Sequence, residues 1–244
     1  MNETRKPDIL PFGDHALLIN FSQEIDPEIN RSVHILAREL KEQRKLGITS
    51  IVPAYCSITV EYDINLTSFT ELSREILGLF DKNNSQNSVK EGLRWKIPVC
   101  YDSRFGLDLK AVAKYTGLNE KEIIALHTSM DFQVFMLGFL PGFAYLGKLP
   151  AKLQCPRKEN PRLKVAKGSV GIAGFQTGIY TLDAPGGWQI LGKTPVLPFD
   201  PERKNPFLFS PGDNVRFHPV PVSVFKKIEM SVHIGNFKTT SLHG

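Results

Sequence analysis

The sequence predicts an α+β protein with a small N-terminal α/β domain followed by an antiparallel β-barrel or sandwich. In the N-terminal part, apolar residues recur at helical spacing in two segments that alternate with short strand-like runs. Between Phe135 and Pro198, β-rich runs are instead interrupted by Gly and Pro every few residues, as in small antiparallel barrels. A polar segment rich in Asn and Ser, residues 81–92, separates the two patterns. We therefore expect an N-terminal domain at residues 1–85, a β-barrel domain at residues 92–222 and a C-terminal tail at residues 223–244.

The N-terminal domain is expected to begin with a strand and a helix. Ala16–Phe21 is an apolar run introduced by a turn, which predicts a strand. Asp26 followed by Pro27 is a helix-start signal, because Asp caps free backbone amides and Pro fits the first helical position. The helix is expected to run until Gly47, with four apolar residues at helical spacing, Ile29, Val33, Leu36 and Leu40.

Two strands and a second helix complete this domain. We expect strands at Ile48–Val52 and Ser57–Tyr62, the second with alternating apolar and polar residues, and an amphipathic helix at Ser68–Phe80. The order strand, helix, two strands, helix predicts a ferredoxin-like unit with its helices on one face of a small sheet.

The barrel domain is expected to open with a strand at Leu93–Tyr101. Two short helices are predicted next, at Asp108–Tyr115 and Glu120–His127, and Asn119 with Glu122 forms a capping-box pattern at the start of the second. The β-rich body that follows has no expected helix. Its strands include Val134–Leu137, Val170–Ala173, Ile179–Leu182, Trp188–Leu191 and Asn214–His218. A short helix and a polar tail are expected after the last strand.

Composition excludes several classes of protein. The 244 residues carry a net charge of +5 that is spread over both halves without a nucleic-acid-binding motif, so we expect no nucleic acid as a partner. There is no apolar run long enough for a membrane span and no signal-peptide core, so we expect no membrane association and a cytoplasmic location. The three Cys residues lack CxxC spacing and the six His residues lack metal-ligand spacing, which predicts reduced thiols and no metal site.

One motif match is misleading. Residues 187–194 satisfy the G-x-x-x-x-G-K-[ST] pattern of phosphate-binding loops. Such a loop leads into a helix, but Pro195 and Pro198 follow, and Trp188–Leu191 is bulky and strand-like. We therefore expect no nucleotide binding by this motif.

Two arginines are the candidates for binding an anion. Arg157 and Arg162 lie in a basic run, each next to a proline that restricts the loop. A planar guanidinium can hold a carboxylate or a phosphate through two parallel hydrogen bonds. The alternative is an ordinary solvated surface loop.

A polar group and an aromatic group complete the candidate substrate site. Gln176, Thr177 and Tyr180 offer an amide, a hydroxyl and a phenol on a Gly-flanked turn, which suits the orientation of a small amide. The alternative is a turn that satisfies its own backbone. Four aromatic residues are expected in the core, at an interface or in a pocket wall, namely Phe139, Phe143, Tyr145 and Trp188. No motif of a hydrolytic nucleophile is present, so the catalytic residues stay unassigned.

Several longer motifs occur in order along the chain. They read PFGDHALLINF (Pro11–Phe21), DPEINRSVH (Asp26–His34), IVPAYCSITVEYD (Ile51–Asp63), LGFLPGFAYLG (Leu137–Gly147), GSVGIAGFQTGIY (Gly168–Tyr180), PGGWQILGKTP (Pro185–Pro195) and SPGDNVRFHP (Ser210–Pro219). Together they resemble the KipI/PxpB family, also called allophanate hydrolase subunit 1, from about residue 10 to about residue 220. The resemblance implies an N-terminal α/β domain followed by a cyclophilin-like β-barrel.

The resemblance also implies a function. Family members act as one component of a bacterial ATP-dependent 5-oxoprolinase, together with a KipA/PxpC-like subunit and a PxpA-like subunit, so ATP is implied for the complex and no activity is expected of this chain alone. In this reading Arg157 or Arg162 would hold the substrate carboxylate or a phosphate. Gln176, Thr177 and Tyr180 would orient the amide.

Two alternatives come from the same resemblance. The name-giving KipI members inhibit a sporulation-type histidine kinase, which would make the chain a binding module for a kinase. A cyclophilin-like barrel also suggests prolyl isomerisation, although a shared fold does not carry a function. The enzyme reading predicts pairing with a KipA-like subunit, whereas the inhibitor reading predicts suppression of kinase autophosphorylation by this chain alone.

Overall fold

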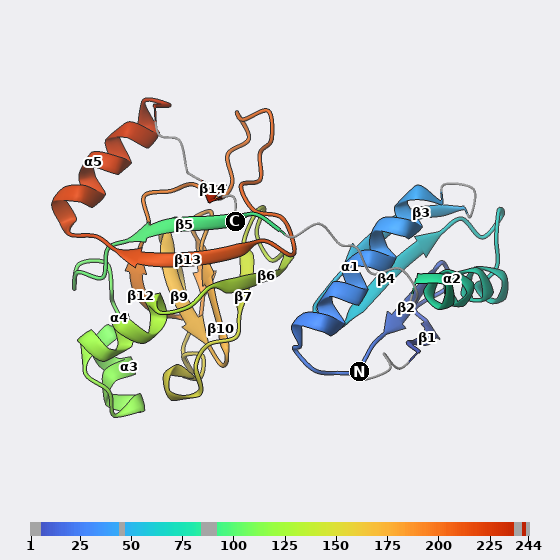
Figure 1. The fold of residues 1–244 in the computed structure, drawn as a ribbon, viewed down its shortest axis with the longest axis horizontal. Helices are drawn as coiled ribbons and strands as arrows, with labels where there is room; N and C mark the ends of the chain where they lie inside the picture. Colours follow the sequence, from blue (N-terminus) through green and yellow to red (C-terminus); the bar gives the residue numbers. More distant parts are fainter. Residues whose placement is uncertain (1–5, 44–46, 84–91, 237–240, 243–244) are drawn as a thin grey trace. The chain divides into compact units, whose positions relative to one another are not determined.

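The computed structural model describes residues 6–43, 47–83, 92–236 and 241–242. The chain divides into two compact units, Met1–Lys90 and Glu91–Gly244. The first is drawn in blue to teal and the second in green to red in Figure 1.

The first unit is a four-stranded antiparallel sheet with two helices. The strand order is β1-β2-β4-β3. The elements in chain order are β1 (Asp8–Pro11), β2 (Ala16–Asn20), α1 (Pro27–Glu42), β3 (Ile48–Pro53), β4 (Ser57–Tyr62) and α2 (Phe69–Asn83). Alternate residues of β2 and β4 pack against the apolar stripe of α1, and the resulting core includes Leu17, Ile19, Val33, Leu36, Leu40, Ile58 and Val60.

Helix α1 begins where the sequence signals predict. The Asp26 side chain accepts hydrogen bonds from the amides of Glu28 and Ile29, at 2.8 and 3.2 Å. Inside the helix, the fully buried Asn30 donates its side-chain amide to the carbonyls of Ala54 and Tyr55, at 3.3 and 3.0 Å. The cap fixes the start of α1, and Asn30 ties the helix to the turn between β3 and β4.

The ferredoxin-like order is not confirmed. That order is β-α-β-β-α-β, whereas this unit reads β-β-α-β-β-α. The edge position beside β2 is taken by β1, which precedes β2 in the chain, and among the described residues of this unit no strand follows α2. The sequence does not predict β1, because its four residues, DILP, lie on an exposed edge and show no alternating pattern.

The second unit is built on a nearly closed, barrel-like sheet. Seven strands follow the order β12-β9-β10-β7-β6-β13-β5, and β14 pairs with the outer side of β5. These strands are β5 (Arg94–Val99), β6 (Phe132–Leu137), β7 (Ala144–Gly147), β9 (Ser169–Ala173), β10 (Gln176–Ile179), β12 (Gln189–Lys193), β13 (Asn214–Pro219) and β14 (Ser241–Leu242). Just after β5, Cys100 exchanges two backbone hydrogen bonds with Lys193 at the end of β12, at 2.8 and 3.0 Å. This seam joins the two ends of the sheet. The prediction of a barrel-like sheet in the second unit is thereby confirmed.

Helices and a short ribbon surround the barrel. They are α3 (Leu109–Thr116), α4 (Glu120–Thr128), the 3-10 helix η2 (Ala151–Leu153), the antiparallel pair β8 (Arg162–Val165) with β11 (Ala184–Gly186), and α5 (Val222–His233). Helices α3 and α4 pack together, and α3 contacts β12 (Figure 1). The predicted capping box of α4 is present, with Asn119 and Glu122 bonding each other's backbone amides at 3.0 and 2.7 Å. Among the described helices, none is long and apolar enough to cross a membrane.

One strand lies earlier than predicted. The sequence predicts a strand at Ile179–Leu182, but β10 covers Gln176–Ile179. The reason is a two-residue hairpin turn, Gly174–Phe175, which pairs Gln176 with Ala173 and starts the strand at once. Gly174 adopts the positive φ of 57° that such a turn requires.

Candidate functional site

The loop before α3 carries a buried aspartate that sequence reasoning missed. Asp108 is 3% exposed, and its carboxylate accepts four hydrogen bonds. Arg162 donates from Nη1 and Nη2 at 2.8 and 2.7 Å, Lys158 donates from Nζ at 3.2 Å, and the Ile190 amide donates at 2.8 Å. One carboxylate thus connects α3, the basic loop, β8 and β12.

Asp108 is ionised despite its burial. Burial alone would raise the pKa of this carboxyl, but the hydrogen bonds from Arg162, the Ile190 amide and Lys158, together with the charge of Arg162, outweigh it and lower the pKa below its usual value. Two cations and one anion leave this cluster with one surplus positive charge. We call Asp108, Lys158 and Arg162 the basic cluster.

Arg157 adds further positive charge beside the basic cluster. Its side chain is exposed, and in the described part of the chain no hydrogen bond or ion pair holds it. Its charge nevertheless acts on two phenols. Burial raises the pKa of Tyr145 and of Tyr180, and Arg157 opposes that rise at both. Arg157 therefore lies on the side of the molecule where these tyrosines gather.

The aromatic residues predicted as core or pocket wall form one cluster. Its centre is Phe143, whose ring centroid lies 5.6 Å from that of Phe139, 4.9 Å from Tyr145, 5.4 Å from Tyr180 and 5.4 Å from Trp188. All four contacts are edge-to-face, the arrangement that aromatic quadrupoles favour. We call these five residues the aromatic cluster.

Phe139 stands out within the aromatic cluster. Its side chain is 61% exposed and its φ is +64°, a conformation that residues other than Gly rarely adopt. Backbone hydrogen bonds hold the turn, from Leu140 N to Gly138 O at 2.8 Å and from Phe143 N to Leu140 O at 3.0 Å. Backbone strain of this kind concentrates at sites of function. The exposed Phe139 ring therefore makes this edge of the aromatic cluster a candidate part of the site.

The predicted polar group is not brought together by the structure. Thr177 is fully buried in the barrel, where its hydroxyl donates to the Gly171 carbonyl at 3.0 Å and lies 2.8 Å from His127 Nε2. Gln176, its neighbour on β10, is half-buried and points to the other face of the strand. Tyr180 lies beyond the end of β10 in the aromatic cluster. Thr177 is therefore a core residue rather than a substrate ligand.

His127 also belongs to the barrel core. Tyr101 Oη lies 2.7 Å from its Nδ1, and its ring stacks on Phe217 with the centroids 4.7 Å apart. Because the Thr177 hydroxyl donates to a carbonyl, it accepts from His127 Nε2, and Nδ1 then accepts from the Tyr101 hydroxyl. Burial lowers the pKa of His127 to about 3, which keeps the imidazole neutral.

Gln189 is a second residue that sequence reasoning missed. Its side-chain amide donates to the Pro156 carbonyl at 3.1 Å, directly before Arg157. Its Oε1 is buried and has no hydrogen-bond partner among the described residues. A buried acceptor without a donor is costly, so this atom is suited to a ligand that brings one.

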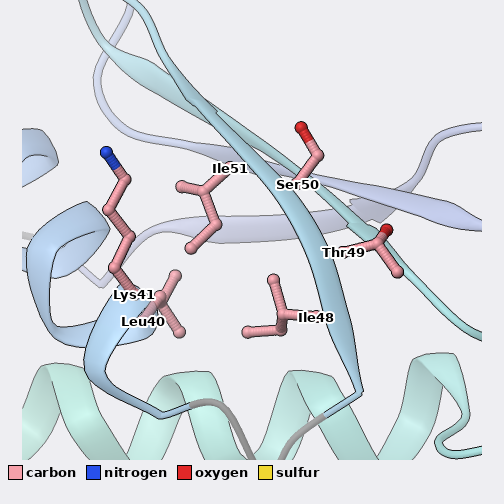
Figure 2. Close-up of a pocket in the computed structure, with 6 residues that line it drawn as sticks. All are labelled: Leu40, Lys41, Ile48, Thr49, Ser50 and Ile51. Carbon is pink, nitrogen blue, oxygen red and sulfur yellow. The ribbon is translucent and has the colours of Figure 1, made fainter.

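The phosphate-loop motif and a pocket in the first unit are not part of this candidate site. Residues 189–193 of the phosphate-loop motif form strand β12, and Lys193 Nζ lies 5.9 and 6.0 Å from the ring centroids of Phe105 and Phe225. A pocket in the first unit is lined by Leu40, Lys41, Ile48, Thr49, Ser50 and Ile51. In Figure 2 its apolar side chains gather while the polar ends of Lys41 and Ser50 point away. Lys193 therefore already has aromatic partners within the chain, and the pocket of the first unit has no aromatic residue in its lining.

Comparison with known proteins identifies the family. The model for the carboxyltransferase domain, subdomain C and D, matches residues 7–209 and so covers most of both units. The B-type subunit of 5-oxoprolinase from Bacillus subtilis (strain 168) is 40% identical over an alignment of 217 residues that covers 84% of this chain and 89% of that protein. The chain belongs to the family of 5-oxoprolinase B-type subunits. The resemblance indicated by the ordered motifs is thereby confirmed.

Two solved structures resemble this chain. The protein TTHA0988 is 38% identical, with a TM-score of 0.74 over 84% of this chain. The match spans only 40% of the length of TTHA0988, so that protein carries a large additional part. The K. lactis urea amidolyase matches 100% of this chain, and 17% of its own length, with a TM-score of 0.80 at 19% identity, which shows a shared fold alone.

Proposed function

We propose that this chain is the B-type subunit of an ATP-dependent, cytoplasmic 5-oxoprolinase. Relatives that carry the name of this subunit, at 40% and 35% identity over most of the chain, support the proposal. The partners we propose are a KipA/PxpC-like subunit, which would complete a shared site, and a PxpA-like subunit. The histidine-kinase alternative is less favoured, because the relatives on which the family assignment rests carry the oxoprolinase name.

The observation that carries the proposal is the basic cluster beside the aromatic cluster. 5-Oxoproline presents a carboxylate and a small, flat lactam ring. Arginine forks are suited to the carboxylate, and aromatic edges are suited to the ring. Gly186 is the partner of Arg162 across the β8–β11 ribbon and also lies against the Tyr180 side chain, which supports a site where both kinds of group reach one small ligand.

The chemistry explains why such a site would be shared. The lactam is a resonance-stabilised amide, so its carbonyl resists attack by water. Phosphoryl transfer from ATP to the amide oxygen forms an O–P bond and releases ADP. Water then adds to the activated carbon and the C–N bond breaks, with the ring nitrogen leaving as the amine, which gives a γ-glutamyl phosphate. A second water displaces phosphate from this acyl phosphate to give glutamate. In this scheme Arg157 and Arg162 hold the carboxylate, Gln176 and Gln189 lie beside the lactam, and the aromatic cluster orients the ring.

The test is ATP hydrolysis by this chain co-purified with a PxpA-like and a KipA/PxpC-like subunit. We expect hydrolysis to be stimulated by L-5-oxoproline, and the stimulation to be lost when this chain is left out. An intact complex that hydrolyses ATP at the same rate with and without L-5-oxoproline would contradict the proposal. Suppression of kinase autophosphorylation by this chain alone would favour the inhibitor reading instead.

A further inference from the structure

The guanidinium of Arg162 has two hydrogen-bonding edges, and Asp108 uses only one. Asp108 is bound end-on, through Nη1 and Nη2. The side edge, made by Nε–H and the second N–H of Nη2, is a separate fork. The same chain shows how that edge is used, because Arg104 binds Asp102 through Nε and Nη2 at 2.7 and 3.2 Å.

The side edge of Arg162 is available to a ligand. Within the described residues no acceptor is hydrogen-bonded to it, and the side chain keeps 25% of its surface exposed. The partner side chain of Asp108 is only 4% exposed, so the ion pair has a closed inner side and an open outer side. The guanidinium is thus held in place from within.

Charge balance favours an anion on the open side. Asp108 neutralises one of the two cations bound to it, Lys158 or Arg162, and Arg157 stands nearby without an ion-pair partner among the described residues. The exposed Glu159 stands in the same loop, so Arg157, Lys158 and Arg162 outnumber Asp108 and Glu159 by one positive charge, while Asp183 is paired with Lys164. A partly buried surplus of positive charge attracts a carboxylate more strongly than an exposed one, because water screens it less.

We propose that Asp108 is a positioning residue that holds Arg162 by one fork so that its second fork binds the carboxylate of the substrate. The proposal rests on the proposed function for the identity of that substrate, but the carboxylate fork itself does not require turnover. The site would then select carboxylate-bearing lactams over neutral amides, since moving Arg162 aside would remove two of the four hydrogen bonds on the buried Asp108 carboxylate. Gln189 Oε1, beside Ile190, is placed to accept from a ring N–H of the same ligand.

The experiment compares L-5-oxoproline with 2-pyrrolidinone, the same lactam without the carboxylate. Binding to the full chain, alone and with its partners, is measured by calorimetry, and turnover of the complex gives KM and kcat. We expect Asp108→Asn to weaken binding of L-5-oxoproline roughly 10- to 100-fold, the range of a charge-assisted hydrogen bond, through KM rather than kcat. Binding of 2-pyrrolidinone should not change. A purely structural role would lower the melting temperature without altering this discrimination.

Two further variants keep the test decisive. Arg162→Lys retains a cation for Asp108 but removes the second fork, so it should fold and lose carboxylate binding even if Asp108→Asn does not fold. Asp102→Asn breaks the exposed pair with Arg104 and is the matched control, with binding expected to be unchanged.

The outcomes separate the two proposals. Carboxylate-dependent binding without ATP turnover would overturn the proposed function and support the role of Asp108. Unchanged binding in a folded Asp108→Asn or Arg162→Lys variant would overturn the role of Asp108, as would a wild-type complex that binds neither lactam or binds both equally.

Discussion

At the residue scale, Asp108 and His127 are both buried, but Asp108 is ionised and His127 is neutral. They are 3% and 0% exposed, respectively. Asp108 is surrounded by donors and cations and stays ionised, whereas His127 meets only the neutral groups of Tyr101 and Thr177. Burial favours the neutral form of a side chain unless hydrogen bonds or opposite charges compensate. The surroundings, rather than the residue type, therefore decide which of the two is suited to bind a charged ligand.

The low pKa of His127 predicts an acid-sensitive barrel. Burial lowers this pKa from 6.5 to about 3, so between these values the unfolded chain binds a proton that the folded chain does not. Its contribution to stability is therefore complete above pH 6.5 and falls as the pH decreases towards 3. We expect the free energy of unfolding of wild type, relative to His127→Gln, to drop by about 2 kcal/mol between pH 7 and pH 5.

Tryptophan fluorescence during urea unfolding measures this difference. Both tryptophans, Trp95 and Trp188, lie in the second unit, so their signal follows the unit that contains His127. Other titrating groups, including the half-buried His218, affect both proteins and cancel in the comparison. A difference that stays constant from pH 7 to pH 5 would contradict this prediction, because it would show that His127 has the same pKa in the folded and the unfolded chain.

At the element scale, two aspartates that precede helices have different roles. Asp26 caps α1 through its side chain, as the sequence pattern predicts. Asp108 occupies the same position before α3 but makes no side-chain cap, because its carboxylate is taken by Arg162, Lys158 and Ile190. An aspartate before a helix therefore need not cap it, and the side chain of Asp108 binds Arg162 instead.

Removing the cap of α1 tests this contrast. Asp26→Ala should destabilise α1 by about 1 kcal/mol, because two backbone amides lose their acceptor. Amide hydrogen exchange of the first turns of α1 measures the loss locally. Asp26→Asn keeps an oxygen at the same place and should exchange nearly as slowly as wild type. Equal exchange in all three proteins would show that packing of the apolar stripe alone holds the helix.

Local signals account for the elements that the sequence predicts, and their absence accounts for those that it misses. Asp26 and Pro27 predict the start of helix α1, and glycines predict the turns of the β9–β10 region. The glycine pattern does not say which glycine makes the turn, so the predicted strand begins three residues later than β10 does. Strand β1 has no signal of its own, because its pairing with β2 depends on a neighbour rather than on its own four residues.

At the scale of the whole molecule, the candidate site depends on contacts between distant segments. Arg157 and Arg162 could be proposed from a basic, Pro-bounded run. Their anchor could not, since Asp108 precedes Lys158 by 50 residues, Arg162 by 54 and Ile190 by 82. Only barrel closure brings α3, β8 and β12 together. The same closure takes Thr177 into the core, which cannot be foreseen from a Gly-flanked turn alone.

Closure of the barrel depends on a glycine at its seam. Cys100 and Lys193 join the two ends of the sheet, and Gly192 lies beside them. A Cβ at position 192 would lie 2.7 Å from the Cys100 carbonyl oxygen and 2.9 Å from Val99 Cγ1, so backbone at the seam would have to move. We expect Gly192→Ala to destabilise the second unit by about 1–3 kcal/mol, as overpacking does, and to weaken ligand binding because β12 carries Ile190 and Gln189.

Gly187→Ala is the matched control for the seam. A Cβ there would meet nothing closer than 3.6 Å, so its effect on tryptophan-monitored unfolding should be small. Loss of stability in Gly192→Ala together with faster hydrogen exchange at Cys100 and Lys193 would place the damage at the seam. If the two alanine variants unfold at the same urea concentration, the seam tolerates displacement, and barrel closure does not hold the basic cluster in place.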